Sequence, residues 1–281
     1  MIGVGHRVVA SSGAGPSGFV DGHTLSQMMT IMGDRAVRMF LPFFETDAAD
    51  DTPVQDVGPR GHHFLKYNTS DQPPYIKGHV LAYRLNGGDV AFDMADHDDF
   101  SMGADGTPAN EPAFTIGIAV KFKSIVGTYN LITRFDQSGV EEVEYRFFFD
   151  SGRPFFSIYD AVQAVFIGRR RNAAYAPDEW LIIFVTYDGS CANTGVRIYV
   201  NGVRVDDNNN SAGGYVAMHN EAASTVVGYH TNAAGNPVNF LWGDCWGPFI
   251  TKKCLSGTAP APGAQSEVVR LTNLYRRVLC L

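Results

Sequence analysis

The sequence predicts an all-β protein, a two-sheet antiparallel sandwich preceded by an N-terminal arm and one short helix. Three observations predict this fold class. Many short apolar segments follow one another, each bounded by the Gly, Asn or Asp residues that are typical of turns. The composition includes 30 Gly, 19 Phe and 12 Tyr, which favour turns and strands. A convincing helical spacing occurs in one segment, and that segment is short.

The helical segment follows a Gly/Ser-rich stretch, residues 1–23, that is typical of an extended arm. Thr24 is the expected N-cap. Four apolar residues then recur at helical spacing and form a stripe: Leu25, Met28, Met29 and Met32. We expect residues 1–37 to be an arm and helix whose stripe contacts a neighbouring subunit. The alternative is that the stripe packs on the chain's own sheet.

Strands and turns dominate from Met39 onward, without intervening helices. A loop-like stretch, SGTAPAPGA, precedes a last segment, EVVRLTNLYRR. We therefore expect one sandwich domain over residues 38–281. The clearest expected strands are residues 39–45, 79–85, 113–122, 130–135, 141–149, 154–160, 162–168, 181–187, 196–205, 224–230 and 239–250.

The segment VRIYVNGVRV, residues 196–205, predicts a β-hairpin. A two-residue Asn201-Gly202 turn of type I′ pairs Val200 with Val203. Five apolar residues then share one face, which we expect to be core: Val196, Ile198, Val200, Val203 and Val205. The preceding LIIFVTY is nearly continuous in apolar residues and predicts a central strand.

Composition and charge exclude several classes of protein. The net charge of −7 argues against a nucleic-acid-binding protein, which needs a basic surface. No apolar run approaches the roughly 20 residues of a membrane span, and the N-terminus has no sustained apolar core like that of a secretory signal. The four cysteines have no metal-binding spacing, so we expect reduced thiols and assembly in a cytoplasm.

The order of "EW", an apolar strand, "TYDGS", a short loop and "VRIYVNGV" resembles the concanavalin A-like jelly rolls of the laminin-G and pentraxin type. AFTIGIAVKF resembles the first long core strand of that family, and STVVGYH the strand after the hairpin. WGPFITKKCLSG with EVVRLTNLYRR resembles its closing strand and terminal short helix. The resemblance implies a jelly-roll sandwich over about residues 38–281.

For function, the resemblance together with the arm and helix is similar to virion structural proteins of tailed phages. It implies a non-enzymatic capsid decoration (cement) protein or a fibre or tail-associated component, located in the virion and attached through its N-terminal arm. The implied partners are the major capsid protein or tail components and further copies of the chain, without nucleic acid or membrane. The alternative is a glycan-binding, lectin-like adhesion module that recognises host surface glycans, with calcium as the one cofactor left open.

Polysaccharide-cleaving enzymes of this fold place carboxylates on alternate residues of one strand. Glu142 and Glu144 are the best candidates here, because they share a face of the EEVEYRF strand. Arg146 lies next on that face and is expected to pair with a neighbouring Glu and keep it ionised. We therefore interpret the face as solvated and predict no catalytic residues.

Three further groups are candidates for binding. Six aspartates in the stretch from residue 89 to 105 contain the oxygen ligands that calcium prefers, although a solvated acidic loop is the commoner explanation: Asp89, Asp93, Asp96, Asp98, Asp99 and Asp105. The basic run Arg169–Arg171 could meet an acidic partner, with a solvated turn as the default interpretation. His62 and His63 lack the HExxH spacing of a zinc site and predict a surface turn.

Overall fold

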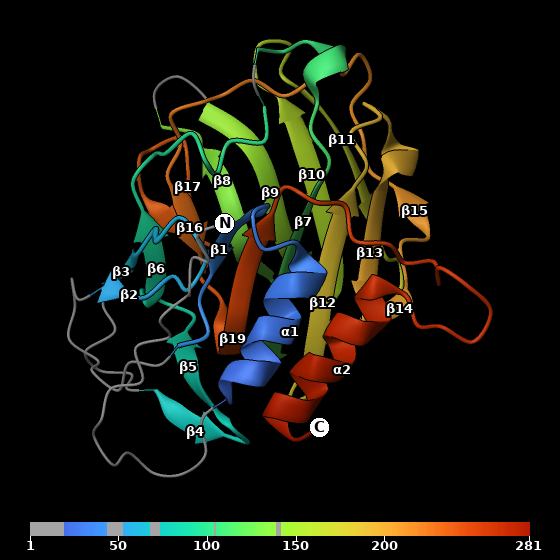
Figure 1. Cartoon of the computed structure of the whole chain (residues 1–281). Coiled ribbons are helices and arrows are strands. Elements are labelled where there is room, and N and C mark those ends of the chain that lie inside the picture. Colours follow the sequence, from blue (N-terminus) through green and yellow to red (C-terminus); the bar gives the residue numbers. More distant parts are fainter. Residues whose placement is uncertain (1–19, 44–52, 68–73, 104, 139–141) are drawn as a thin grey trace.

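In a computed structural model of the chain, the described residues form two stacked β-sheets and two α-helices (Figure 1). The structure describes residues 20–43, 53–67, 74–103, 105–138 and 142–281. The predicted two-sheet antiparallel sandwich is confirmed. No helix in these ranges is long and apolar enough to cross a membrane.

The first sheet carries both helices on its outer face, and we call it the helix-covered sheet (Figure 1). Its centre is the long antiparallel pair β7 (Phe114–Phe122) and β12 (Trp180–Tyr187), which the sequence predicted as core strands. In spatial order its strands are β14 (Val203–Arg204), β13 (Val196–Val200), β12 (Trp180–Tyr187), β7 (Phe114–Phe122), β19 (Trp242–Thr251), β5 (Val80–Asn86) and β4 (Tyr75–Lys77), with β1 (Val37–Phe40) also pairing with β19.

The second sheet, which we call the helix-free sheet, packs against the inner face of the first. Strands distant in the chain lie side by side in it, as β8 beside β16, which is the crossover pattern of a jelly roll. In spatial order its strands are β15 (Asn208–Asn209), β11 (Val165–Arg170), β10 (Arg153–Asp160), β9 (Glu142–Asp150), β8 (Thr128–Asp136), β16 (Thr225–Val227), β6 (Ala91–Met94), β3 (Phe64–Tyr67) and β2 (Pro53–Val54), with β17 (His230–Thr231) beside β8 and β18 (Pro237–Val238) beside β17. Two short 3-10 helices, η1 (Pro108–Asn110) and η2 (Asn193–Gly195), lie in connections.

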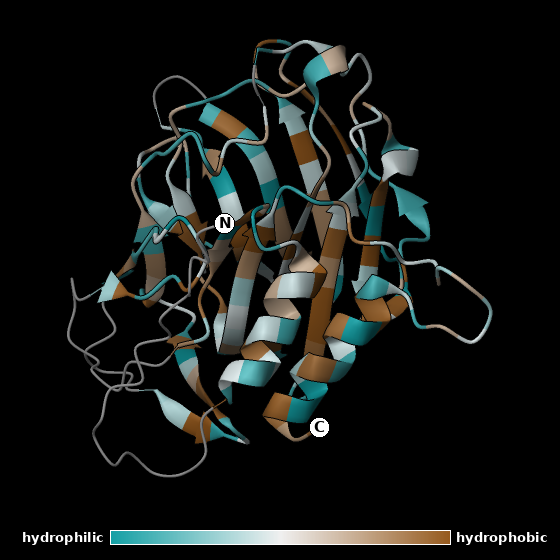
Figure 2. Cartoon of the chain, in the orientation of Figure 1, coloured by the Kyte–Doolittle hydropathy of each residue, from teal (hydrophilic) through white to brown (hydrophobic). Residues whose placement is uncertain are grey.

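The core fills the space between the two sheets. Alternate residues of each strand point inward, so Phe122 of β7 meets Phe149 of β9 with ring centroids 4.4 Å apart. Figure 2 shows the same pattern in the hydropathy colouring: β12 is hydrophobic along most of its length, whereas the two helices alternate hydrophobic and hydrophilic residues. The inward-facing aromatic and branched side chains therefore determine how the sheets stack.

The C-terminal segment forms α2 (Glu267–Leu279), as the resemblance implied. Ser266 caps it by accepting a hydrogen bond from the backbone N–H of Val269 at 3.3 Å. Its buried Tyr275 packs against Trp246 at 4.8 Å and donates a hydrogen bond to the carbonyl oxygen of Gly247 at 2.5 Å. These contacts fix α2 on the outer face of the helix-covered sheet.

The N-terminal helix, α1 (Gly22–Met32), begins earlier than predicted. Asp21 is the N-cap, since its carboxylate accepts the backbone N–H of Thr24 at 2.6 Å, whereas Thr24 itself is buried in the first turn. The prediction of Thr24 as N-cap was wrong because both residue types can cap a helix and Asp21 comes first in the chain. α1 lies beside α2 on the same sheet (Figure 1).

The apolar stripe of α1 covers the chain's own sheet, which is the alternative that the sequence left open. Met28 and Met32 are fully buried in the sandwich's hydrophobic core, and Leu25 and Met29 pack partly buried against it. Two polar bonds anchor the end of the helix: Thr251 donates to the carbonyl oxygen of Met32, and the Lys253 ammonium to that of Ile31, both at 2.7 Å. The two buried methionines are therefore unavailable as contacts for a neighbouring subunit while α1 is packed.

The predicted hairpin is present, with one correction. Asn201 and Gly202 have φ values of 53° and 84°, as a type I′ turn requires, and Val200 pairs with Val203. Val203, however, is 64% exposed and not part of the core. It lies on the two-residue strand β14 at the edge of the sheet, which leaves most of its side chain open to solvent.

Candidate functional site

The carboxylate pair that could have been catalytic is not accessible. Glu142 is half-buried, but Glu144 is fully buried and accepts hydrogen bonds from the Nε and Nη2 of Arg134 at 3.0 and 2.8 Å. The expected solvated face was wrong for Glu144, and its partner is Arg134 and not Arg146. Arg146 instead donates to Asn130 at 2.8 Å and lies over the ring of Phe148 at 4.3 Å.

The Arg134–Glu144 pair is a structural centre. The two oxygens of Glu144 also accept the backbone N–H groups of Met102 and Glu221, and Arg134 reaches Asp96 at 2.8 Å. Burial raises the pKa of Glu144, against the opposing effect of the Arg134 charge. A carboxylate held by a guanidinium and two backbone donors has no free lone pair aimed at a substrate. Its bonds to Met102 and Glu221 instead tie two loops to β8 and β9. Nothing in the sequence around Arg134 indicated this pairing.

The six aspartates are separated by the fold. Each of five has a partner of its own: Asp89 bonds Asn86, Asp96 bonds Arg134, Asp98 bonds Asn220, Asp99 bonds His62, and Asp105 bonds Asn110. Among the described residues, no three of the six carboxylates lie within 4.8 Å of one another. A calcium cage needs six to eight converging oxygens, and these side chains do not supply it.

The remaining predicted groups are in ordered surroundings. The basic run was expected in a solvated turn, but Arg169 and Arg170 belong to β11. Arg169 pairs with Asp206 at 3.1 Å, Arg170 lies over Phe155, and Arg171 lies over Tyr175. The residues of the run therefore stabilise the edge of the helix-free sheet.

The histidine pair was expected in a surface turn, and the cysteines were expected to be reduced and structural. His63 accepts the backbone N–H of Asp56 at 3.1 Å, and His62 bonds Asp99. All four cysteines are free thiols.

A face rich in tryptophan and charged groups lies where α1 and α2 leave the helix-covered sheet uncovered. Directly paired residues form a row across four strands: Trp180 of β12 opposite Lys121 of β7, Lys121 opposite Asp244 of β19, and Asp244 opposite Arg84 of β5. Paired residues share a face of a sheet, so all four side chains point outward. We define the tryptophan face as this row with three outward neighbours: Tyr75, Lys123 and Trp242.

Trp242 is the most accessible ring of this face. It is 45% exposed, although it belongs to a strand whose next nine residues are all buried. Gly87 lies directly under it, since a Cβ at Gly87 would be 2.7 Å from the Cβ of Trp242. The close approach of this glycine holds the indole at the rim with its outer side open to solvent.

Charged side chains order the rest of the face. The buried carboxylate of Asp244 accepts a bond from Arg84 at 3.0 Å and lies 3.7 Å from the Lys121 ammonium. The Arg84 guanidinium lies 5.3 Å from the ring centre of Tyr75. Burial, and then the hydrogen bond and charge of Asp244, raises the pKa of Tyr75, so its hydroxyl stays protonated. The face thus presents fixed hydrogen-bond donors beside two indole rings, with Lys121 on the strand between them and Arg84 on the strand beyond Trp242.

This arrangement suits a sugar. Trp180 and Trp242 lie on strands separated by β7, which places them about 10 Å apart across the sheet. Their rings offer apolar surface for the C–H faces of sugar rings, and Lys121 and Arg84 offer N–H groups for hydroxyls. Sequence reasoning missed this face because its members come from four distant strands. The sequence signal that could have indicated it is Trp242, an aromatic residue on the outward-facing register of its strand, two residues before Asp244.

A second group of aromatic rings lies on the outer face of the helix-free sheet. Arg146 covers Phe148, Arg170 covers Phe155, and the two rings stack on each other at 5.0 Å. The guanidinium groups occupy the ring faces that a ligand would need. The tryptophan face is therefore the better candidate.

Comparisons with known proteins agree with the fold. The family model for the concanavalin A-like lectin/glucanases superfamily matches residues 95–242, more than half of the 281 residues. No curated protein sequence matches the chain.

Solved structures with the same fold include two of botulinum neurotoxins. The receptor binding domain of botulinum neurotoxin D has a TM-score of 0.53 at 12% identity, over 80% of this chain and 51% of that chain. A structure of botulinum neurotoxin type C, whose cell entry depends on interaction with two ganglioside molecules, has a TM-score of 0.52 at 14% identity, over 88% and 52%. The chain thus spans about half the length of these structures.

An enzyme structure is also similar. A mutant of Trypanosoma rangeli sialidase with trans-sialidase activity has a TM-score of 0.55 at 11% identity, over 92% of this chain and 38% of that chain. At these identities the likeness shows the fold alone.

Proposed function

The chain belongs to the concanavalin A-like lectin/glucanases superfamily, and from this premise we propose that it is a non-enzymatic glycan-binding domain. The observation that carries the proposal is the tryptophan face, where Lys121 lies between Trp180 and Asp244, and the exposed Trp242 lies two residues from Asp244 on β19. Soluble proteins seldom leave a large ring half-exposed next to fixed hydrogen-bond donors without a ligand to cover it.

Two further observations support the choice of ligand. Arg84 and Lys121 carry N–H groups that can donate to sugar hydroxyls, and the fully buried Asp244 holds both side chains in place. Botulinum neurotoxin type C, which has a structure of the same fold, depends on interaction with two ganglioside molecules for cell entry. This likeness supports a host surface glycan as the ligand class. Calcium is not needed for this mode of binding.

The absence of catalysis is part of the proposal. Glu144 is fully buried and committed to Arg134, so the Glu142 and Glu144 pair cannot act as the two accessible carboxylates of a hydrolytic mechanism. Incubation of the chain with any glycan it binds should release no reducing ends. Hydrolysis that is lost in Glu142→Gln would contradict this part.

A glycan array tests the proposal. The wild-type chain should bind at least one class of oligosaccharide, and Trp242→Ala and Trp180→Ala should lose that binding. Tyr67→Ala is the matched control, because Tyr67 is a 37% exposed ring on the helix-free sheet. Binding that survives both tryptophan variants, or that fails in Tyr67→Ala alone, would place the site elsewhere.

A structural role in a tailed-phage virion stays a proposal that the resemblance of the sequence supports. With the methionines of α1 buried, attachment would use the outer side of α1, where His23, Gln27 and Thr30 line a cavity of about 330 Å³ together with Arg270 of α2. Immunolabelling of purified particles should detect the chain, and Gln27→Cys should cross-link to a capsid or tail protein, or to a second copy. Particles without the chain would exclude this role while leaving glycan binding untouched.

A further inference from the structure

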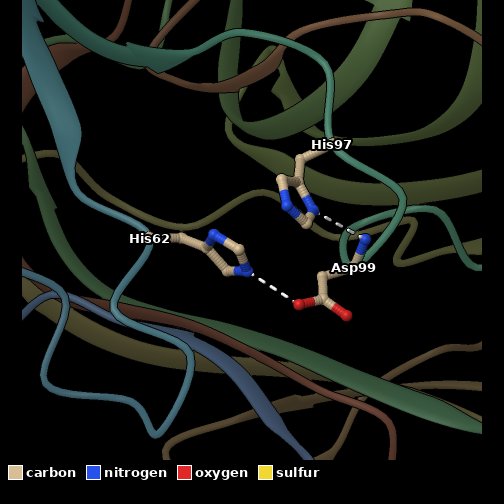
Figure 3. A group of neighbouring side chains, drawn as sticks. All are labelled: His62, His97 and Asp99. Carbon is tan, nitrogen blue, oxygen red and sulfur yellow. Dashed lines mark hydrogen bonds and ion pairs between the residues drawn. The ribbon is translucent and has the colours of Figure 1, made fainter.

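Three metal-ligating side chains meet away from the tryptophan face. His62 lies between β2 and β3, and His97 and Asp99 lie in the turn after β6 (Figure 3). The Nε2 of His62 is 2.7 Å from Asp99 Oδ2, and the Asp99 backbone N–H donates to His97 Nδ1 at 3.1 Å. One ligand atom of each residue lies within 4.8 Å of the others.

Backbone contacts hold this cluster in place. The buried carboxylate of Asp56 accepts the backbone N–H groups of His62, Gly58 and Phe40, which fixes the loop that carries His62. Phe100 packs under the His62 ring with centroids 5.0 Å apart. The outer side stays accessible, since His97 is exposed and the other two residues are half-buried.

We propose that His62, His97 and Asp99 form a binding site for a divalent transition metal ion such as zinc, with water as the fourth ligand. Two imidazoles and a carboxylate are the donors that zinc, cobalt and nickel prefer. Tetrahedral coordination at metal–ligand distances of about 2.0–2.2 Å places the ligand atoms about 3.4 Å apart. Side-chain rotations that move the ligand atoms by about 1 Å therefore assemble the site. The ion replaces the His62–Asp99 hydrogen bond and the bond from Asp99 N–H to His97. It would tie the loop before β3 to the turn after β6.

Neighbouring positive charges limit the affinity. The guanidinium Nε atoms of Arg38 and Arg60 each lie 3.7 Å from an oxygen of Asp99, and the Lys252 ammonium is near enough for its charge to be felt. Arg38 is largely buried and can stay paired with Asp99 Oδ1 while Oδ2 binds the ion. It then orients the carboxylate of Asp99. Arg60 is about half-exposed and opposes the ion directly. Removing the charge of Arg60 should therefore tighten metal binding.

Calorimetric titration of the full, metal-stripped and tag-free chain with zinc chloride tests the site. We expect one ion per chain, a loss of affinity of at least about tenfold in His97→Ala and Asp99→Asn, and a severalfold gain in Arg60→Gln. His23→Ala, which removes an exposed histidine on α1, is the control and should bind like the wild type.

Cobalt provides a second readout, because tetrahedral binding to two imidazoles and a carboxylate gives visible absorption bands that surface adsorption does not give. Circular dichroism of each variant confirms that it is folded. No binding below millimolar zinc, or binding that His97→Ala and Asp99→Asn leave unchanged, would overturn the proposal. So would cobalt binding without those bands.

Discussion

Truncation of Met28 to alanine should destabilise the whole sandwich, because α1 shares the core of the domain. The Met28 side chain is 0% exposed and belongs to the same cluster as the residues between the sheets. Replacing a buried methionine by alanine costs about 2–5 kcal/mol, the transfer term plus the cavity left behind. Against a total stability of about 5–15 kcal/mol, this is a large fraction.

Urea denaturation followed by tryptophan fluorescence measures the effect. With a slope of about 3 kcal/mol per molar urea, a loss of about 3 kcal/mol lowers the midpoint by about 1 M. Met32→Ala, at the next turn of the same face, should behave alike. Ser26→Ala, on the exposed side of the helix, is the control and should stay within about 0.5 kcal/mol of the wild type.

An unchanged urea midpoint in these variants would contradict the packing of α1 in the core. If Met28→Ala and Met32→Ala unfold at the wild-type midpoint, α1 is a detachable arm, and its stripe is free to contact a neighbouring subunit as the sequence first suggested. If both variants lose stability together, the helix is part of the domain.

Three further predictions concern stability. Glu144→Gln should cost about 3–5 kcal/mol in urea denaturation because it leaves the Arg134 charge buried with one exposed partner, whereas Glu142→Gln should have little effect; equal effects would contradict the pairing. Burial, and then the charge of Arg146, lowers the pKa of His230 to about 4. The unfolded chain therefore binds a proton that the folded chain does not as pH falls from about 6.5 to 4, so stability should drop by up to about 3 kcal/mol over this range, and His230→Gln should remove that part of the slope. Gly202→Val should lower the melting temperature by an amount equivalent to about 1–2 kcal/mol, since φ is 84° at this turn position; an unchanged melting temperature would mean that the turn is not type I′.

The features that the sequence predicted correctly are those that depend on residues close together in the chain. The hairpin at Asn201-Gly202 depends on a two-residue turn and on alternation within ten residues, so its register was correct. The exposure of Val203 was not predictable in the same way, because it depends on which part of the opposite sheet lies beneath β14. Local pattern gives the face of a strand, and the fold decides whether that face is covered.

The stripe on α1 shows the same limit. Its spacing indicated an apolar face but could not indicate whether the chain or a partner covers it. The core of the sandwich covers Met28 and Met32.

The candidate site was beyond local reasoning. Trp180 and Trp242 are far apart in the chain and come to the same face because β7 pairs with both β12 and β19. Glu144 was expected to face solvent because alternation placed it opposite the core residues of β9. Alternation cannot reveal that loops close over the outer face of β9 and bury its contact with Arg134. Non-local pairing therefore decided every functional candidate.

Tryptophan side-chain NMR shows whether a glycan binds across Trp180 and Trp242. The chain has three tryptophans, so a ¹⁵N-labelled sample gives three indole N–H signals. Trp246 is fully buried and its N–H donates to the carbonyl oxygen of Pro42 at 2.9 Å, so it serves as an internal control. On titration with a glycan identified by array, the signals of Trp180 and Trp242 should shift together and saturate while that of Trp246 stays in place. Saturable binding that leaves the signals of Trp180 and Trp242 unmoved would place the glycan site away from the tryptophan face.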